Sequence, residues 1–111
     1  MISFLLALAV SAHLYPEKHY QQIWCDEQKG VMEYRLDDGA RVDCLTDEYA
    51  IEFDFAPKWA ESIGQSLYYS EKTRRKPGVV LIMEHDSDQR FLSRINKIGD
   101  KYGIMIWTVT P

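Results

Sequence analysis

The chain has 111 residues and a formal net charge of −4, and 27% of its residues are charged. This length predicts a single domain with one hydrophobic core, and the composition excludes an intrinsically disordered chain. Proteins that bind nucleic acid tightly are more often basic, so the acidity is mild evidence against such a partner. A cluster of functional carboxylates would itself add negative charge.

The N-terminus resembles a secretory signal peptide. Residues 2–10 form an apolar run interrupted only by Ser3, and the small residues Val10 and Ala12 occupy the −3 and −1 positions of a cleavage after Ala12. No Lys or Arg precedes the run, so a strand or helix docked on the core remains the alternative. The run is too short to span a bilayer. We expect residues 1–12 to be a signal peptide, residues 13–111 to form one domain, and the protein to be exported to the periplasm or secreted.

The first half of the chain predicts one helix and three strands. The helix begins at Pro16-Glu17, where a proline and an acid suit a first turn, and Gly30 is placed to end it. Strands are expected at residues 31–36, 41–45 and 49–55. The sequence Asp37-Asp38-Gly39 is a strong hairpin signal between the first two.

The second half predicts a helix, a strand, a helix and a strand. The first of these helices begins at Pro57 and ends at residues 76–78, and Gly64 marks a closely packed face. The unbroken apolar run 79–83 is typical of a strand buried on both faces. The last helix begins at Ser87-Asp88 and ends at Gly103, and residues 104–109 form the last strand. The order is αβββαβαβ, which predicts an α/β fold with a central mixed five-stranded sheet flanked by helices.

The two cysteines leave two possibilities open. Cys25 and Cys44 show no CxxC motif and no His at zinc-ligand spacing, so ligation of a metal by thiolates is disfavoured. In an exported protein they are expected to form a disulfide between the first helix and the second strand. In a cytosolic protein they would be two free buried thiols.

Carboxylates lie on the second and third predicted strands. Asp43 lies in the second strand, and Glu52 and Asp54 end the third. Acidic side chains on adjacent strand ends are a common way to hold a divalent cation against a phosphodiester, and their oxygens suit Mg²⁺ or Mn²⁺. The sequence therefore predicts a metal-dependent nuclease.

The element order and the acidic residues together resemble the PD-(D/E)XK nuclease superfamily, which has the restriction-endonuclease-like fold. The resemblance covers nearly the whole chain after residue 15. It implies that Asp43 and Glu52 bind the metal, joined by the backbone carbonyl of Phe53. Glu17 matches an acid that several branches carry on the first helix. Gln65 and Tyr69 match the Gln-x-x-x-Tyr motif of RecB-type branches.

One residue departs from the family pattern. The family motif ends in a Lys two residues after the acid of the third strand, and Asp54 stands there. The family tolerates a Lys relocated to the following helix, and Lys58 is placed to reach back. The implied catalytic set is Asp43, Glu52 and Lys58, with Glu17, Asp54, Gln65 and Tyr69 in support. Its reaction would be metal-activated attack of water on a phosphodiester, with DNA as the expected substrate.

Other interpretations of these residues stay open. Asp54 suits a third metal ligand or a helix N-cap equally well. Lys58 and Gln65 would otherwise be solvated helix positions, and Tyr69 part of the core. The basic run at residues 72–76 is either a helix C-terminus or a phosphate-contacting patch.

Two other functions remain possible. A degenerate, non-catalytic family member would bind nucleic acid or a protein partner, which the missing Lys and the net negative charge favour. An unrelated α/β structural module of the cell envelope would leave the acids solvated.

Overall fold

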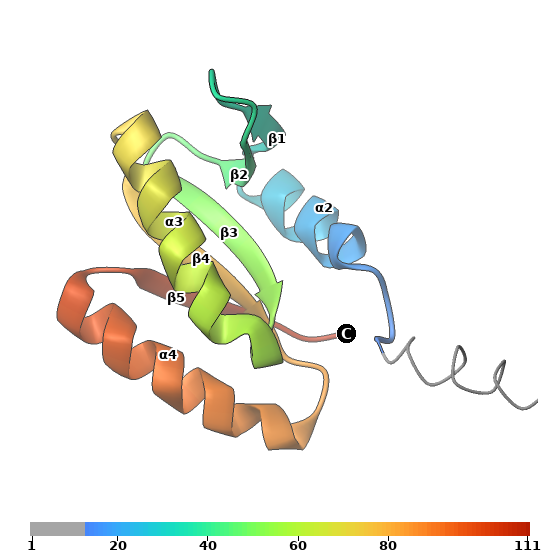
Figure 1. Ribbon diagram of the computed structural model, residues 1–111. Coiled ribbons are helices and arrows are strands. Elements are labelled where there is room, and N and C mark those ends of the chain that lie inside the picture. Colours follow the sequence, from blue (N-terminus) through green and yellow to red (C-terminus); the bar gives the residue numbers. More distant parts are fainter. Residues whose placement is uncertain (1–12) are drawn as a thin grey trace, which may run out of the picture.

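The structure, a computed structural model, describes residues 13–111 and has the predicted order αβββαβαβ (Figure 1). The predicted signal peptide at residues 1–12 lies outside the described residues. Helices α2, α3 and α4 span Glu17–Glu27, Trp59–Thr73 and Gln89–Tyr102; strands β1 to β5 span Val31–Arg35, Arg41–Leu45, Tyr49–Phe55, Lys76–Ile82 and Met105–Val109; the 3-10 turns η1 and η2 span Ala56–Lys58 and Asp86–Asp88.

The five strands form one mixed sheet in the order β1-β2-β3-β4-β5. The first three are antiparallel to one another, and β3, β4 and β5 run parallel. Strand β4 therefore lies inside the sheet, and its residues Val79 to Ile82 are fully buried. The prediction that this apolar run is an internal strand is confirmed.

Helices cover both faces of the sheet: α2 lies on one side, and α3 and α4 lie on the other (Figure 1). Side chains of β3 alternate between these layers. Ile51 and Phe53 pack in the core on the α2 side, whereas Ala50 packs with Tyr69 of α3. Because Glu52 and Asp54 share the parity of Ala50, they point toward the α3 side of the sheet.

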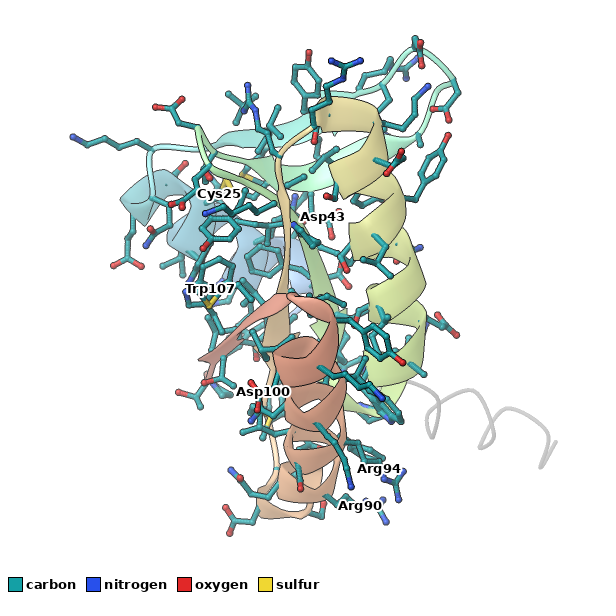
Figure 2. The ribbon with its side chains drawn as sticks, turned by 90° about the vertical axis from the view of Figure 1, so that its left-hand side faces the viewer. Cys25, Asp43, Arg90, Arg94, Asp100 and Trp107 are labelled. Carbon is teal, nitrogen blue, oxygen red and sulfur yellow. A yellow bond between two sulfur atoms is a disulfide. The ribbon has the colours of Figure 1, made fainter. Side chains whose placement is uncertain are left out.

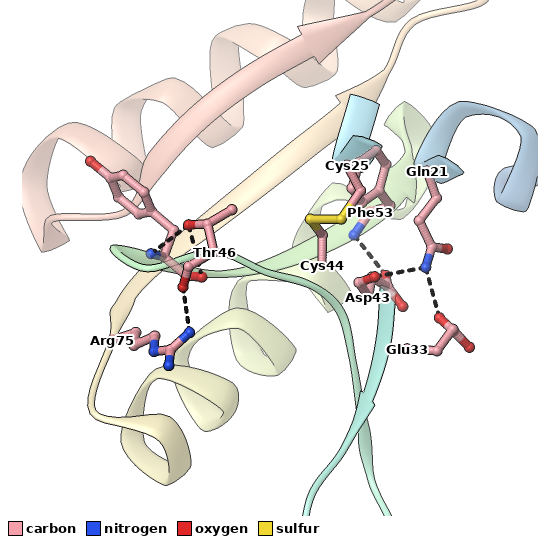
Figure 3. The surroundings of a disulfide bond; sticks show 9 residues. Gln21, Cys25, Glu33, Asp43, Cys44, Thr46, Phe53 and Arg75 are labelled. Atoms are coloured by element: carbon pink, nitrogen blue, oxygen red, sulfur yellow. Dashed lines mark hydrogen bonds between the residues drawn. A yellow bond between two sulfur atoms is a disulfide. The ribbon is translucent and has the colours of Figure 1, made fainter. Parts of the chain in front are cut away.

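A disulfide joins Cys25 of α2 to Cys44 of β2, as the even cysteine count predicted (Figure 3). Both cysteines are fully buried. A Cβ atom at Gly30 would lie 2.5 Å from the Cys44 sulfur and 2.8 Å from the Cys25 sulfur. The left-handed residue after α2 is Lys29, with φ 57°, and not the expected Gly30. Gly30 is therefore needed to make room for the disulfide.

Two predictions about α3 are wrong. Helix α3 ends at Thr73, because Arg74 adopts the left-handed conformation with φ 60° and its N–H is donated to the carbonyl of Ser70. Residues 76–78 therefore begin β4 and do not end the helix. Gly64 does not mark a packed face, since a Cβ atom there would meet no atom within 4 Å.

A buried carboxylate ties the first described residues to the far end of β4. Glu84 accepts hydrogen bonds from His13 Nδ1 at 2.8 Å, the Leu14 N–H at 3.0 Å and the Tyr20 hydroxyl at 2.7 Å. The Glu84 side chain is only 3% exposed. Burial raises its pKa, but these hydrogen bonds outweigh burial and hold the pKa below its ordinary value.

Candidate metal and phosphodiester site

Asp43 lies where strands β2 and β3 separate. The two strands pair at Cys44 with Ile51 and at Leu45 with Ala50, and the recorded pairing stops there. Beyond this point Asp43 Oδ2 accepts the N–H of Phe53 at 2.8 Å. The side chain thus takes the place of a backbone hydrogen bond between the two strands, and Asp43 lies between the sheet and α3 (Figure 2).

The carboxyl groups of Asp43 and Glu52 come together at this point, on neighbouring strands. They lie close enough to share a proton, which one of them would have to carry. Glu52 is 6% exposed, and its pKa is raised well above its ordinary value by burial and then by the Asp43 charge. Burial also raises the pKa of Asp43, although the hydrogen bonds from Glu52 and the Phe53 N–H oppose it. The two acids that the resemblance pairs are thus close together.

Asp54 and Glu17 extend this cluster. The pKa of Asp54 rises from 3.8 to about 7, because the side chain is buried and the Asp43 charge is near, while the Lys58 ammonium opposes the rise. The pKa of Glu17, the first residue of α2, rises from 4.5 to about 7 through burial and the charges of Asp43 and Asp54. Each of the four acids therefore resists ionisation without a nearby cation.

Lys58 is the cation whose charge acts on these acids. It precedes α3 as the last residue of η1, it is exposed, and its charge lowers the pKa of both Glu17 and Asp54. The alternative that Asp54 caps the following helix is wrong. Phe55 and Lys58 occupy the N-cap positions of η1 and α3, and neither turn has a side-chain cap.

The two predicted helix residues differ in their placement. Tyr69 is 8% exposed, and its pKa is raised by burial and then by the charges of Glu52 and Asp43, so its hydroxyl lies near these acids. It also packs against Val42 and Ala50, so the core interpretation holds as well. Gln65 is exposed, and its side chain takes part in none of the side-chain hydrogen bonds among residues 13–111.

Sequence reasoning missed two members of the cluster, Glu33 and Gln21. Gln21 is 2% exposed and donates from Nε2 to Glu33 Oε2 and to the Asp43 carbonyl, both at 2.8 Å (Figure 3). Glu33 has φ 52°, in the left-handed region that is unfavourable for this residue type. The flanking pairs Met32 with Cys44 and Tyr34 with Val42 place Glu33 opposite Asp43. The hairpin signal fixes this register, so the sequence did carry a sign of Glu33.

The cluster supplies carboxylate pairs and not a closed cage of ligands. In the described part of the chain, no group of three or more His, Cys, Asp or Glu side chains is arranged to hold a metal ion. Asp43 and Glu52 can offer two carboxylates to one cation. Phe53 contributes its N–H to Asp43, and the role of its carbonyl as a ligand stays a prediction.

Comparison with known proteins gives one relative. The chain is 31% identical over 90 residues to a protein of Acanthamoeba polyphaga mimivirus that is named for a KilA-N domain. The match covers 81% of this chain and 24% of that protein, so the chain spans about a quarter of the relative's length. No family model matches the chain, and no solved structure matches it.

No helix within residues 13–111 is both long enough and apolar enough to cross a lipid bilayer.

Proposed function

We propose that this chain is a nuclease-like protein of the PD-(D/E)XK superfamily that uses Mg²⁺ or Mn²⁺ to hydrolyse phosphodiester bonds of DNA. The observation that carries the proposal is the closeness of Asp43 and Glu52, which neighbour each other on β2 and β3 and shift each other's pKa. The pair lies where β2 and β3 separate, with the charge of Lys58 close enough to act on the same cluster.

The topology supports the restriction-endonuclease-like assignment. A helix, an antiparallel three-stranded meander, a crossover helix and a parallel fourth strand follow one another in the order that the resemblance implies. The acids of this resemblance lie on the second and third strands of the meander. The match to a protein named for a KilA-N domain adds nothing to this choice, because the chain spans only 24% of that protein.

The residues fit a hard divalent cation. All the donors are oxygens, and Mg²⁺ is usually held by one or two carboxylates with waters and substrate phosphates completing its shell. Asp43 and Glu52 would hold the ion, which supplies an activated water and charge neutralisation at the phosphate. Lys58 would stabilise negative charge on the phosphate, and Glu17 and Gln21 would keep the ligands in place.

A non-catalytic binding module is the second candidate. Asp54 replaces the family's Lys and adds negative charge where a phosphate must approach, which favours binding without cleavage. A structural module with solvated acids is disfavoured, since Glu52 and Asp54 are 6% and 7% exposed.

A cleavage assay tests the nuclease proposal. The full chain would be incubated with supercoiled plasmid and labelled oligonucleotides in Mg²⁺, in Mn²⁺ and in EDTA. We expect cleavage only with metal, and a loss of about 100-fold or more in Asp43→Asn and Glu52→Gln. Lys58→Ala should lose cleavage but keep metal binding, and the exposed Glu27→Gln serves as the matched control.

The outcomes separate the two candidates. Cleavage that persists in Asp43→Asn or in EDTA contradicts the proposed site. Metal binding without cleavage of any substrate favours the binding module.

We also propose that the protein is exported. The disulfide between Cys25 and Cys44 supports this, because disulfides persist mainly in oxidising compartments. Cell fractionation followed by N-terminal sequencing should find a chain that begins at His13. A chain that retains residue 1 and stays with the cytosolic fraction would contradict it.

A further inference from the structure

Four positive side chains form one line along helix α4. Arg90, Arg94, Lys97 and Lys101 recur at steps of four, three and four residues, which places them within about 60° of one another around the axis. All four are exposed. We call these four residues the basic stripe. It runs roughly 16 Å along the helix, at the 1.5 Å rise of each residue.

The acidic and uncharged polar residues of α4 lie elsewhere on its surface. In Figure 2, Asp100 projects to one side of α4 and Arg90 and Arg94 to the other, nearer α3; by helical position Asp100 lies about 60° around the axis from Lys97. By their helical positions, Ser93 and Asn96 lie on the same face of α4 as Asp100. The whole chain has a net charge of −4, so this helix face is positive on a protein that is negative overall.

None of the four stripe residues forms an ion pair with the described part of the protein. Instead, aromatic rings support three of them. The guanidinium groups of Arg90 and Arg94 lie 4.5 and 5.6 Å from the centre of the Phe91 ring, and the Lys101 ammonium lies 5.6 Å from that of Tyr102. Such contacts orient the side chains without neutralising their charge.

The basic run at the end of α3 is different, because three of its four cations are engaged within the chain. Lys72 pairs with Asp37 at 2.8 Å, Lys76 pairs with Glu48 at 3.0 Å, and Arg75 donates to the carbonyl of Thr46. The structural interpretation of residues 72–76 is therefore the better one. The basic stripe, which the sequence analysis did not single out, gathers four exposed cations outside the ion pairs of the described chain on one helix face.

The stripe begins at the end of α4 that packs near η1. Phe91 and Leu92 at the start of α4 pack against the core cluster that includes Ala56 of η1, and η1 ends at Lys58. A polyanion lying along the stripe would thus approach Lys58, whose charge acts on Glu17 and Asp54. Consecutive phosphates of one DNA strand rise about 3.4 Å along the axis, so the stripe matches the length of roughly five of them.

We propose that the basic stripe of α4 binds the phosphate backbone of a DNA duplex and guides it to the acidic cluster. This inference rests on the proposed function, because it takes the substrate from there. It adds a surface on a different helix, which should bind DNA whether or not a metal is present.

The test measures DNA binding by the full chain in EDTA. Fluorescence anisotropy of a labelled duplex reports the binding over a range of NaCl concentrations. The stripe variant combines Arg90→Gln, Arg94→Gln, Lys97→Gln and Lys101→Gln. The control variant combines Lys18→Gln, Lys29→Gln, Arg35→Gln and Arg41→Gln. The control residues are also exposed and outside the ion pairs of the described chain, so both variants lose four positive charges.

We expect the stripe variant to bind DNA at least about tenfold more weakly at low salt, and its slope of log K against log salt to be smaller by about 3 to 4. The control variant should keep the wild-type slope. Equal losses in the two variants, no binding by the wild type, or preference for anionic phospholipid vesicles over DNA would each overturn the proposal.

The cleavage and binding assays distinguish failure of the nuclease proposal from failure of the stripe proposal. Stripe-dependent DNA binding without cleavage in Mg²⁺ or Mn²⁺ would leave this inference standing and contradict only the nuclease. Cleavage that is unchanged in the stripe variant at low and moderate salt would contradict the stripe and leave the nuclease standing.

Discussion

Replacing Asp54 with Asn should stabilise the metal-free protein, by an amount that depends on pH. Asp54 is 7% exposed and lies beside other carboxylates, so its ionisation is costly in the folded chain. Asn keeps the size of the side chain and removes the charge. Most buried substitutions destabilise a protein, which makes a gain in stability a demanding prediction.

The size and sign follow from the pKa. The pKa of Asp54 is 3.8 in the unfolded chain and about 7 in the folded protein, so between these values the folded state holds a proton that the unfolded state has lost. The free energy of unfolding therefore falls as pH rises from about 4 to about 7. Three pKa units correspond to about 4 kcal/mol. Since Asp43, Glu52 and Glu17 share this repulsion, we expect about half of it, roughly 2 kcal/mol, as the gain of Asp54→Asn at pH 8 relative to pH 4.

Urea unfolding followed by tryptophan fluorescence, in EDTA at pH 4, 6 and 8, measures this gain. Asp100→Asn, an exposed substitution on α4, controls for the loss of one negative charge. Added Mg²⁺ should shrink the gain, because a bound cation would neutralise the repulsion that Asn removes. An effect of Asp54→Asn that is the same at pH 4 and pH 8, or that Asp100→Asn reproduces, would refute the reasoning.

Three further predictions concern the fold. Gly64→Ala should raise the free energy of unfolding by about 1 kcal/mol in urea titrations, because nothing obstructs a methyl group there and Ala favours the helix; a loss would mean a hidden contact. Replacing both Cys25 and Cys44 with Ala should lower it by about 3 kcal/mol for a bridge between residues 19 apart, and an unchanged midpoint would show that the bridge does not form in solution. Glu84→Gln should cost about 1 to 3 kcal/mol at pH 7. Because the folded pKa of Glu84 is depressed, this stabilisation exists above its unfolded pKa and should disappear as pH falls through the folded pKa, so acid titration of the wild type and the variant should converge.

Local signals were enough to predict the sheet. The Asp37-Asp38-Gly39 turn forms as expected, with Gly39 at φ 91°, and sets the register of the first hairpin. The unbroken apolar run before Glu84 became the internal strand, because burial on both faces selects such runs. Asp43 and Glu52 could be paired from the sequence, since adjacent strands place their acids side by side.

Tertiary effects explain what the sequence did not reveal. Gln21 is buried because α2 packs against the sheet where Gln21 donates to the Asp43 carbonyl, and a helical pattern cannot show a contact with a distant strand. Glu33 takes a left-handed conformation that no propensity favours. Gly30 is required by the disulfide sulfurs on two other elements, so its role appears only once they are assembled.

Calorimetric titration of the full chain with Mn²⁺ tests the central claim, that Asp43 and Glu52 form a divalent-cation site, more directly than any other measurement. The account predicts saturable binding at one site that releases protons at neutral pH, because carboxyl groups with raised pKa values must ionise to bind the ion. Glu52→Gln should abolish this binding, and Glu27→Gln should leave it unchanged. Binding that is equal in the wild type and Glu52→Gln, or no heat at millimolar Mn²⁺, would contradict the account.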